Sequence, residues 1–274
     1  MELIIKNLDA NFRVDMILNR VIHGDCLEIM KKLPSEIVDM VFFDPPYFLQ
    51  LPDNKRLIRW EVKTEVESPE EYWDKFSSFQ EYDEFITKSL NEIRRLMKHN
   101  ATIWAIGTYH NIHRIGKIMQ DLGFWILNDV IWFKTNPMPN WLGVRLTNST
   151  ETIIWATKDK NSKKYTFNKD IAREYSNRDW GKKLAYNVWK LPICMGKERL
   201  KNNEGKRLHP TQKPEELLER IILISTKPND IVFDPMAGTG TTGVIARRCG
   251  RNFIMIEKEQ KYIEAIMERL INSL

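Results

Sequence analysis

The chain has 274 residues, of which 42% are hydrophobic and 29% charged, and its formal net charge is +5. This size and composition support one substantial core with a small insertion. They argue against a membrane protein, because no apolar run approaches the length of a span and the first residues lack the pattern of a signal peptide. We therefore expect a cytoplasmic protein. Cys26, Cys194 and Cys249 are scattered and odd in number, which disfavours disulfides and a zinc site.

The first expected element is a short strand over residues 20–23, which ends at Gly24-Asp25, and a helix over residues 26–32 follows it. Asp25 has two interpretations that the sequence leaves open. Its carboxylate can cap the N-terminus of the helix, and it can also accept hydrogen bonds from a ligand at the end of the strand.

The next expected strand, over residues 38–43, runs into Asp44-Pro45-Pro46-Tyr47. A short β-branched and aromatic run cut by two prolines predicts a buried strand that presents a carboxylate at the carboxyl edge of a sheet, where open α/β sheets bind ligands. Asp44 and a proline carbonyl can accept both hydrogens of an amino group, while Tyr47 stacks on the planar group that carries it. The alternative is a proline turn with a surface tyrosine.

Residues 48–78 form a long acidic stretch with interspersed aromatic residues, directly after this tetrapeptide. Its position favours a lid over a substrate, with a solvated loop as the alternative. The elements that follow are a helix over 80–97, a strand over 101–106, a helix over 112–120 and strands over 125–134 and 151–157. The last two strands are expected to pair as the antiparallel edge of the sheet.

Residues 156–207 hold fifteen Lys and Arg against six Asp and Glu, a net charge of +9, which leaves −4 for the rest of the chain. Aromatic residues alternate with the basic ones, a pattern typical of surfaces that hold phosphates and stack on bases. They are Tyr165, Phe167, Tyr175, Trp180, Tyr186 and Trp189. We expect DNA contacts from Lys163, Lys164, Lys182 and Lys183, and a solvated lysine-rich face is the alternative.

A helix over residues 215–225 precedes a βαβ unit: a strand over 230–234, a glycine turn, a helix over 243–249 and a strand over 253–257, with a closing helix over 261–270. Such a unit typically holds a nucleoside, with the terminal acid on its ribose. The residues expected to bind it are Asp234, Pro235, Ala237, Gly238, Gly240, Thr241, Thr242 and Glu257. The GxGxxG pattern also fits a dinucleotide, but Asp234 suits a cationic ligand better than a pyrophosphate.

Taken in order, the motifs resemble a β-class, S-adenosylmethionine-dependent DNA adenine-N6 methyltransferase of the cell-cycle-regulated type that modifies GANTC. The likeness covers nearly the whole chain. It rests on Gly24-Asp25-Cys26, Asp44-Pro45-Pro46-Tyr47, residues 106–111, Asn136-Pro137-Met138-Pro139-Asn140, His209-Pro210-Thr211-Gln212-Lys213-Pro214 and the turn from Asp234 to Thr242. The catalytic motif precedes the cofactor motif, the order that defines this class. No cysteine follows a proline, the dipeptide that resembles a cytosine-C5 methyltransferase nucleophile.

The resemblance implies a Rossmann-like class I methyltransferase fold of the α/β class, with a mostly parallel seven-stranded sheet, one antiparallel strand and a permuted motif order. The catalytic core is then expected over residues 1–155 and 208–274, with a target-recognition insert over 156–207. S-adenosylmethionine is the implied cofactor, without a metal. Asp25 is expected near its adenine and Lys213 near its methionine carboxylate. Asn136 and Asn140 are expected to contact DNA.

The implied reaction is direct methyl transfer to the N6 amino group of an adenine that is flipped out of double-stranded DNA. Asp44 and the Pro45 carbonyl would accept the amino hydrogens, Pro46 would stiffen the backbone, and Tyr47 would stack on the base. A homodimer is the expected assembly. The alternatives are cytosine-N4 methylation, a dinucleotide-dependent oxidoreductase and a non-catalytic DNA-binding module. Serine commonly stands at the position of Asp44 in the cytosine-N4 group, so adenine is the first choice.

Overall fold

The computed structural model describes residues 3–6, 12–49, 57–59, 64–66, 74–140 and 143–272. Most of the expected lid over residues 48–78 lies outside this set, so its closure stays a prediction. The described part of that segment contains β4 (Leu57–Arg59) and β5 (Thr64–Val66), which pair antiparallel. Among the described residues, no helix is long and apolar enough to cross a membrane.

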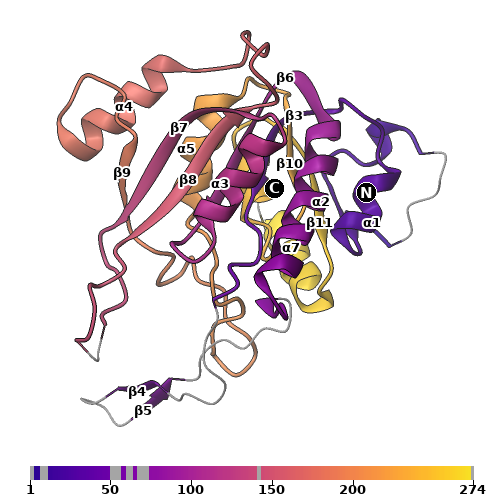
Figure 1. Ribbon diagram of the computed structural model, residues 1–274. Helices are drawn as coiled ribbons and strands as arrows, with labels where there is room; N and C mark the ends of the chain where they lie inside the picture. Colours follow the sequence, from indigo (N-terminus) through magenta and orange to yellow (C-terminus); the bar gives the residue numbers. More distant parts are fainter. Residues whose placement is uncertain are drawn as a thin grey trace.

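The described residues form one main sheet of nine strands (Figure 1). Its order is β1 (Ile4–Ile5), β2 (Arg20–His23), β11 (Asn252–Glu257), β10 (Ile231–Asp234), β3 (Val38–Phe43), β6 (Met97–Gly107), β8 (Thr150–Thr157), β7 (Trp125–Lys134) and β9 (Val188–Leu191). Every neighbouring pair is parallel except β6 with β8 and β8 with β7, so β8 alone runs against the others. The expectation of one antiparallel strand in a mostly parallel sheet is confirmed.

The expected number of seven strands was wrong, because β1 and β9 extend the sheet at its two edges. Residues 125–134 and 151–157 pair antiparallel as expected, but they do not form the edge. Four residues from the expected insert continue the ladder as β9, which lies parallel to β7 with Val188 beside Ile131 and Leu191 beside Lys134. Part of the segment over residues 156–207, strand β9, is therefore built into the core sheet.

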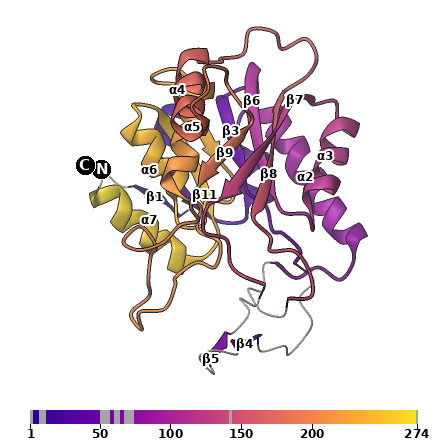
Figure 2. The same cartoon turned by 90° about the vertical axis from the view of Figure 1, so that its left-hand side faces the viewer.

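Helices cover both faces of the sheet in three layers, which the two views in Figures 1 and 2 show from different sides. One face carries α1 (Cys26–Lys32), α2 (Phe79–Leu96) and α3 (Ile112–Asp121). The other carries α4 (Lys169–Trp180), α5 (Glu215–Ser225), α6 (Thr241–Arg248) and α7 (Gln260–Asn272). A short 3-10 helix over Val14–Met16 precedes β2.

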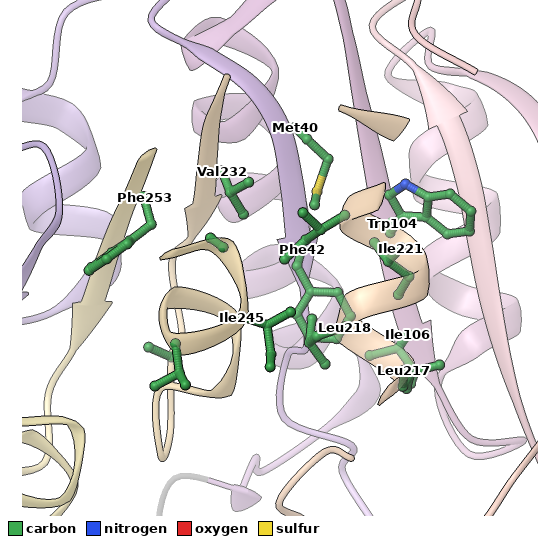
Figure 3. Packing of buried hydrophobic residues seen from close by; sticks show 14 of the residues in the cluster. Met40, Phe42, Trp104, Ile106, Leu217, Leu218, Ile221, Val232, Ile245 and Phe253 are labelled. Carbon is green, nitrogen blue, oxygen red and sulfur yellow. The ribbon is translucent and has the colours of Figure 1, made fainter. Parts of the chain in front are cut away.

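Successive side chains of β3 supply both cores, because side chains alternate between the faces of a strand. Met40 and Phe42 pack with α5 and α6 (Figure 3), whereas Val41 and Phe43 pack with α1, α2 and α3. Burial on both sides explains why this strand is a nearly continuous apolar run. It also fixes where the strand ends, since Asp44 is the first carboxylate after the run and lies at the carboxyl edge of the sheet.

Candidate active site

Three segments that are far apart in sequence meet at the carboxyl ends of the adjacent strands β3, β10 and β11. They enclose a cavity of about 380 Å³. Its lining includes thirteen of the fourteen residues expected at the catalytic and cofactor sites: Asp25, Asp44, Pro45, Pro46, Tyr47, Lys213, Asp234, Pro235, Ala237, Gly238, Thr241, Thr242 and Glu257. A ligand-binding edge at the carboxyl ends of parallel strands is the arrangement that this class of sheet favours.

Asp44 lies deep in this cavity and has one engaged and one open oxygen. Its Oδ2 pairs with the ammonium of Lys213 at 2.7 Å. Its Oδ1 is buried and accepts no hydrogen bond from the described residues. Burial raises the pKa of Asp44 above its usual range, and the charge of Lys213 opposes that rise. The open oxygen is therefore an unused acceptor on a residue that lines the cavity.

The two proline carbonyls of the tetrapeptide differ as the two oxygens of Asp44 do, because one accepts hydrogen bonds and the other is open. The Pro46 carbonyl accepts a hydrogen bond from the Tyr82 hydroxyl at 2.9 Å and another from Nδ2 of Asn111 at 3.3 Å. No described residue donates to the Pro45 carbonyl. Tyr82 and Asn111 thus fix the backbone of the tetrapeptide and leave Asp44 and Pro45 as its open acceptors.

Tyr47 is buried and its hydroxyl donates to Oε2 of Glu151 at 3.0 Å. The other oxygen of Glu151 pairs with Lys134 at 2.8 Å. This buried pair was not predicted from the sequence. The expected antiparallel pairing of residues 125–134 with 151–157 could have indicated it. That pairing places Lys134, at the end of the first strand, close to Glu151, at the start of the second, at the edge of the sheet that holds Asp44.

The cofactor side of the cavity is acidic. Glu257 accepts three backbone N–H groups, from Gly238 at 2.8 Å, Lys258 at 2.8 Å and Glu259 at 2.7 Å. Burial raises the pKa of Glu257 to about 7.

Asp234 accepts a hydrogen bond from the Thr242 hydroxyl at 2.6 Å and another from the Met236 amide at 3.0 Å. Burial, together with the charges of Asp44 and Glu257, raises the pKa of Asp234 to about 7. Carboxylates that are this hard to ionise favour a cationic ligand.

The two glycines of the turn have different roles. Both adopt the left-handed conformation, with φ of 52° at Gly238 and 74° at Gly240. A Cβ at Gly238 would lie 3.3 Å from Nε2 of His209 on the cavity wall, but one at Gly240 would lie 2.7 Å from Cγ1 of Ile266 in α7. Gly240 does not line the cavity. It permits close packing of the turn against α7, so the expected direct contact with the cofactor is corrected for this residue.

Of the two roles that the sequence left open for Asp25, the structure shows the helix cap. Its Oδ1 caps α1 by accepting from the Leu27 amide at 3.0 Å, and Oδ2 lies 3.6 Å from the ammonium of Lys258. The residue also lines the cavity. Within the described residues, no group of three His, Cys, Asp or Glu side chains is placed to hold a metal ion.

The four lysines expected at DNA lie away from the cavity. The Lys164 amide bonds Oδ1 of Asn100 near the start of β6, and Lys163 is adjacent. The cavity lies at the other end of β6, beyond Gly107, which is about 20 Å away at 3.3 Å per residue. Lys182 and Lys183 are exposed in the turn between α4 and β9. The structure therefore does not place these lysines and Asp44 on one surface.

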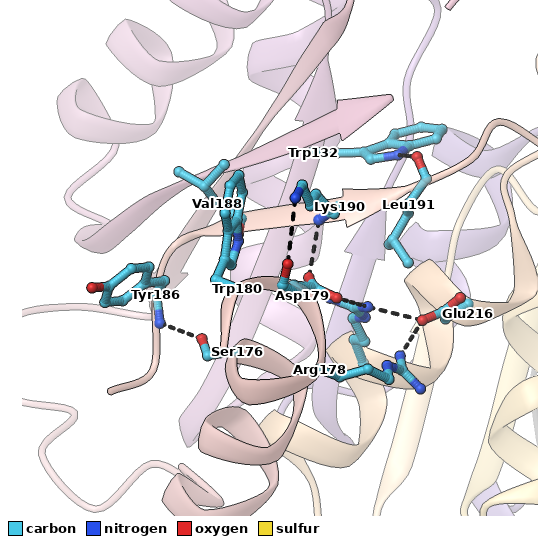
Figure 4. A network of polar contacts seen from close by, with 11 residues as sticks. Trp132, Ser176, Arg178, Asp179, Trp180, Tyr186, Val188, Lys190, Leu191 and Glu216 are labelled. Carbon is cyan, nitrogen blue, oxygen red and sulfur yellow. Dashed lines mark hydrogen bonds and ion pairs between the residues drawn. The ribbon is translucent and has the colours of Figure 1, made fainter. Parts of the chain in front are cut away.

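Polar contacts hold α4 to the core (Figure 4). The buried Arg220 of α5 pairs with Asp179 at 2.5 Å and with Glu216 at 2.8 Å. The Lys190 amide donates to the same Asp179 at 2.9 Å. These contacts dock α4 on α5 and β9. The charge of Arg178 in α4 is also engaged, because it pairs with Glu216 of α5.

Asn136 and Asn140 lie at the catalytic edge, in the loop that connects β7 with β8. Oδ1 of Asn136 accepts from the Ile193 amide at 2.8 Å, and Nδ2 of Asn140 donates to the Arg145 carbonyl at 2.6 Å. Both amides thus shape the loop. Arg145 itself is exposed and donates to the Tyr109 hydroxyl at 2.8 Å.

Comparison with known proteins shows the same organisation. A family model of DNA methylases, of the N6 and N4 type, matches residues 38–268. The Type II methyltransferase M.HinfI of Haemophilus influenzae is 49% identical over 253 residues, which cover 92% of this chain and 68% of that protein. The Type II methyltransferase M2.LlaDCHI of Lactococcus lactis subsp. cremoris is 40% identical over 250 residues, 91% of this chain and 88% of the relative.

Solved structures also resemble this one. The crystal structure of M1.HpyAVI in complex with SAM has a TM-score of 0.62 and 29% identity, and the match covers 91% of this chain and 98% of that one. PvuII DNA methyltransferase, which is cytosine-N4-specific, has a TM-score of 0.67 at 20% identity over 91% and 85% of the two chains, a likeness of fold. The family match over residues 38–268 shows that this chain belongs to the N6 and N4 family of DNA methylases.

Proposed function

We propose that the chain methylates the N6 amino group of adenine in double-stranded DNA, with GANTC as its recognition sequence and S-adenosylmethionine as the methyl donor. The observation that carries the proposal is the pair of open acceptors on adjacent residues, Oδ1 of Asp44 and the carbonyl of Pro45. An exocyclic amine offers two hydrogens, and two fixed acceptors are what its recognition requires.

The lining of the cavity fits the proposed cofactor. When bound, S-adenosylmethionine supplies an electrophilic methyl group on a positively charged sulfur. Asp234 and Glu257 line the wall opposite the catalytic tetrapeptide, and ionising them there is costly without a nearby cation. Gly238 lets the backbone approach the ligand closely, and Glu257 keeps acceptor capacity for ribose hydroxyls beyond its three backbone bonds.

Asp44 and Pro45 would orient the target amine. The lone pair of an aromatic amine is delocalised into the ring, so it is a weak nucleophile. Two hydrogen bonds to fixed acceptors hold both amino hydrogens and direct the lone pair toward the methyl group. Because Tyr82 and Asn111 hold the Pro46 carbonyl, these acceptors are positioned before the substrate arrives. Such alignment of two bound reactants is a large source of rate acceleration.

Tyr47 would support a base that has left the duplex. A base that stays stacked in a duplex cannot reach an acceptor buried as deeply as Oδ1 of Asp44, so the base must be flipped out at a cost of a few kcal/mol. Stacking on an aromatic ring offsets about 1–3 kcal/mol of such a cost. The bond from the Tyr47 hydroxyl to Glu151 holds that ring in a defined orientation.

DNA is proposed to bind across the loops at the catalytic edge. The loop between β7 and β8 and the segment after β9 expose large apolar side chains there, Met138, Val144, Leu146 and Met195. Exposed cations accompany them at Arg145 and Lys197. Cations beside exposed apolar side chains suit a bent or opened duplex, because the cations bind phosphate while apolar side chains fill the space that a displaced base leaves.

Cytosine-N4 methylation is the second candidate, since cytosine offers a comparable amine to the same two acceptors. The family assignment overturns the oxidoreductase alternative. Sequencing of methylated DNA from cells that express the chain separates the remaining candidates, because it identifies the base and the recognition sequence together. N6-methyladenine in GANTC is expected, and N4-methylcytosine would overturn the proposal. The expected homodimer is tested separately by sedimentation.

A further inference from the structure

Lys213 contacts two of the residues that the proposed target base would also contact, Asp44 and Tyr47. Its ammonium donates to Oδ2 of Asp44 at 2.7 Å and lies 5.0 Å from the centroid of the Tyr47 ring. An adenine held by the same residues would place its amino group at the Asp44 carboxylate and its ring over Tyr47. We propose that Lys213 competes with the target base for the face of Tyr47, and that the carboxylate of the cofactor relieves this competition.

The competition follows from the burial of the partners. The side chain of Lys213 is 6% exposed and that of Asp44 is 17% exposed, so water does little to screen their attraction. Cation and aromatic ring also attract one another at this distance. A base that stacks on Tyr47 must displace the ammonium from that ring and so disturb its pair with Oδ2 of Asp44, while the open Oδ1 accepts from the base. This cost opposes entry of the base as long as Lys213 stays over Tyr47.

A second anion at Lys213 would lower this cost. An ammonium has three donors. Within the described residues, two are engaged, by Asp44 and by the Thr211 carbonyl at 3.2 Å. The third can bind a carboxylate from the cofactor side, because Lys213 lines the same cavity as Asp234 and Glu257.

The other cations of this wall are less suited to that carboxylate. Burial lowers the pKa of His209 to about 3, so its ring is uncharged at neutral pH. Lys258 is largely exposed and lies 3.6 Å from Asp25.

The consequence is a thermodynamic coupling that rests on the proposed function but goes beyond it. A carboxylate that draws Lys213 toward the cofactor frees the face of Tyr47 for the base. Binding of the cofactor should then favour entry of the base, and entry of the base should strengthen cofactor binding by the same factor. Lys213 is thus a positioning residue that orders the two binding events and does not itself react.

The test uses two non-reactive ligands that differ in the carboxylate. S-adenosylhomocysteine carries it, whereas 5′-methylthioadenosine lacks the whole amino-acid part. The readout is the fluorescence of 2-aminopurine placed next to the target adenine, which keeps the N6 amino group of the target, with DNA affinity measured in parallel. With saturating S-adenosylhomocysteine we expect base exposure and about tenfold tighter DNA binding, within the usual range of coupling. With saturating 5′-methylthioadenosine both should stay close to the ligand-free values.

Lys213→Met should remove the dependence, so that DNA affinity is the same with and without S-adenosylhomocysteine. Lys258→Met, a matched change at the same cavity, should keep it. Equal effects of the two ligands on the wild-type protein would overturn the proposal even if Lys213→Met failed to fold. If the sequencing experiment finds no methylated base, the proposed function fails, whereas methylation with equal ligand effects rejects the coupling alone.

Discussion

The hydroxyl of Tyr47 donates a hydrogen bond to Glu151 at 3.0 Å, although the two residues are 104 positions apart in the chain. Glu151 in turn pairs with Lys134, and the side chains of this pair are only 11% and 10% exposed. Each of these charges depends on the other, because neither is well hydrated. The catalytic tetrapeptide is therefore anchored to strands β7 and β8 through one buried ion pair.

Removing one partner of this pair should destabilise the protein. Lys134→Met or Glu151→Leu alone leaves a buried charge unpaired, which is expected to lower the free energy of unfolding by about 3–5 kcal/mol. The double variant should recover most of that loss in urea unfolding. It should nevertheless methylate DNA slowly, because Tyr47 has no acceptor.

The matched control is the exposed pair of Lys117 and Asp121 on α3. The double variant Lys117→Met with Asp121→Leu should change stability by no more than about 1 kcal/mol. A Lys134 and Glu151 double variant that methylates at the wild-type rate would show that the pair only stabilises the fold.

Asp44→Asn tests the acceptor role directly. Asparagine keeps the shape of the side chain, but it loses the charge and replaces one acceptor by a donor. The methylation rate is expected to fall by about 100- to 1,000-fold, as for other fixed polar groups at a reacting centre. Affinity for S-adenosylmethionine should stay within a few-fold, because Asp234 and Glu257 are unchanged. Asp121→Asn serves as the surface control, and a near wild-type rate for Asp44→Asn contradicts the assignment.

The two turn glycines should respond differently to alanine. Gly240→Ala combines backbone strain of about 1–2 kcal/mol with a collision against Ile266, so unfolding should become easier by more than the strain alone. Gly238→Ala should lose only the stability that backbone strain costs, and it should also weaken cofactor binding, because the new methyl group lies against His209 on the cavity wall. Urea unfolding and calorimetric titration with S-adenosylhomocysteine separate the two effects.

Gly250→Ala is the control for strain, since Gly250 has φ of 71° and no atom within 4 Å of an added Cβ. The loss of stability in Gly250→Ala measures the cost of the backbone strain alone. If Gly240→Ala costs no more than Gly250→Ala, the close contact with α7 is not what requires glycine there.

Much of this fold could be predicted because local signals agreed with the packing. The strand over Val38–Phe43 is bounded by Asp44 and two prolines, and both of its faces are buried, so its limits follow from the sequence. Helix α2 carries a regular apolar stripe, and Ser78 caps it by accepting from the Glu81 amide at 3.1 Å. The cavity lining was predictable for a similar reason, since every expected residue except Lys213 lies at the end of a recognisable parallel strand or in the turn and helix start that follow it.

The segment over residues 156–207 was misinterpreted because composition does not show what a side chain packs against. Tyr175 and Trp189 were expected to stack on bases, but both are buried in the core beside α5. Only two apolar side chains of α4, Ala172 and Tyr175, are buried, so its helical period is weak. The pair of Lys134 and Glu151 was equally hidden, because a buried ion pair depends on strand register that local patterns do not specify.

Cofactor affinity should rise with pH. Burial raises the pKa of Asp234 from 3.8 to about 7 and that of Glu257 from 4.5 to about 7. The protonated forms of both carboxyl groups stabilise the folded state. This contribution is complete below their pKa values in the unfolded chain and is lost as the pH rises through about 7, so the ligand-free protein should lose stability as the pH rises to about 7. A cation prefers the ionised carboxylates. Affinity for S-adenosylmethionine should therefore increase between pH 6 and 8, by up to about tenfold per pH unit for each proton released.

S-adenosylhomocysteine provides the matched ligand, because it lacks the positive charge on sulfur but shares every other titrating group. Its affinity should change less over the same pH range in calorimetric titrations. Parallel pH profiles for the two ligands would show that these carboxylates do not sense the charge on sulfur.

DNA affinity should depend on cations at the catalytic edge and not on those at the far end of the sheet. Arg145 is linked to Tyr109 just after β6, and Lys197 lies on the segment that Asn136 ties to the same loop. Each phosphate contact contributes about 0.9 to the slope of log affinity against log salt on duplex DNA. Arg145→Ala with Lys197→Ala should flatten this slope by about 1.8 if both touch phosphate. Target and non-target duplexes should lose similar affinity, because phosphate contacts carry no sequence information.

The control replaces the same number of charges at Lys163 and Lys164, beside the start of β6. Binding measured over a salt series should keep its original slope in that double variant, because a duplex whose base reaches Asp44 lies about 20 Å away at the other end of the strand. Steering by overall charge could still slow association slightly, but it does not change the number of phosphates contacted. The opposite result would be a flatter slope for Lys163→Ala with Lys164→Ala and an unchanged slope for Arg145→Ala with Lys197→Ala. It would indicate that DNA binds to the basic segment over residues 156–207.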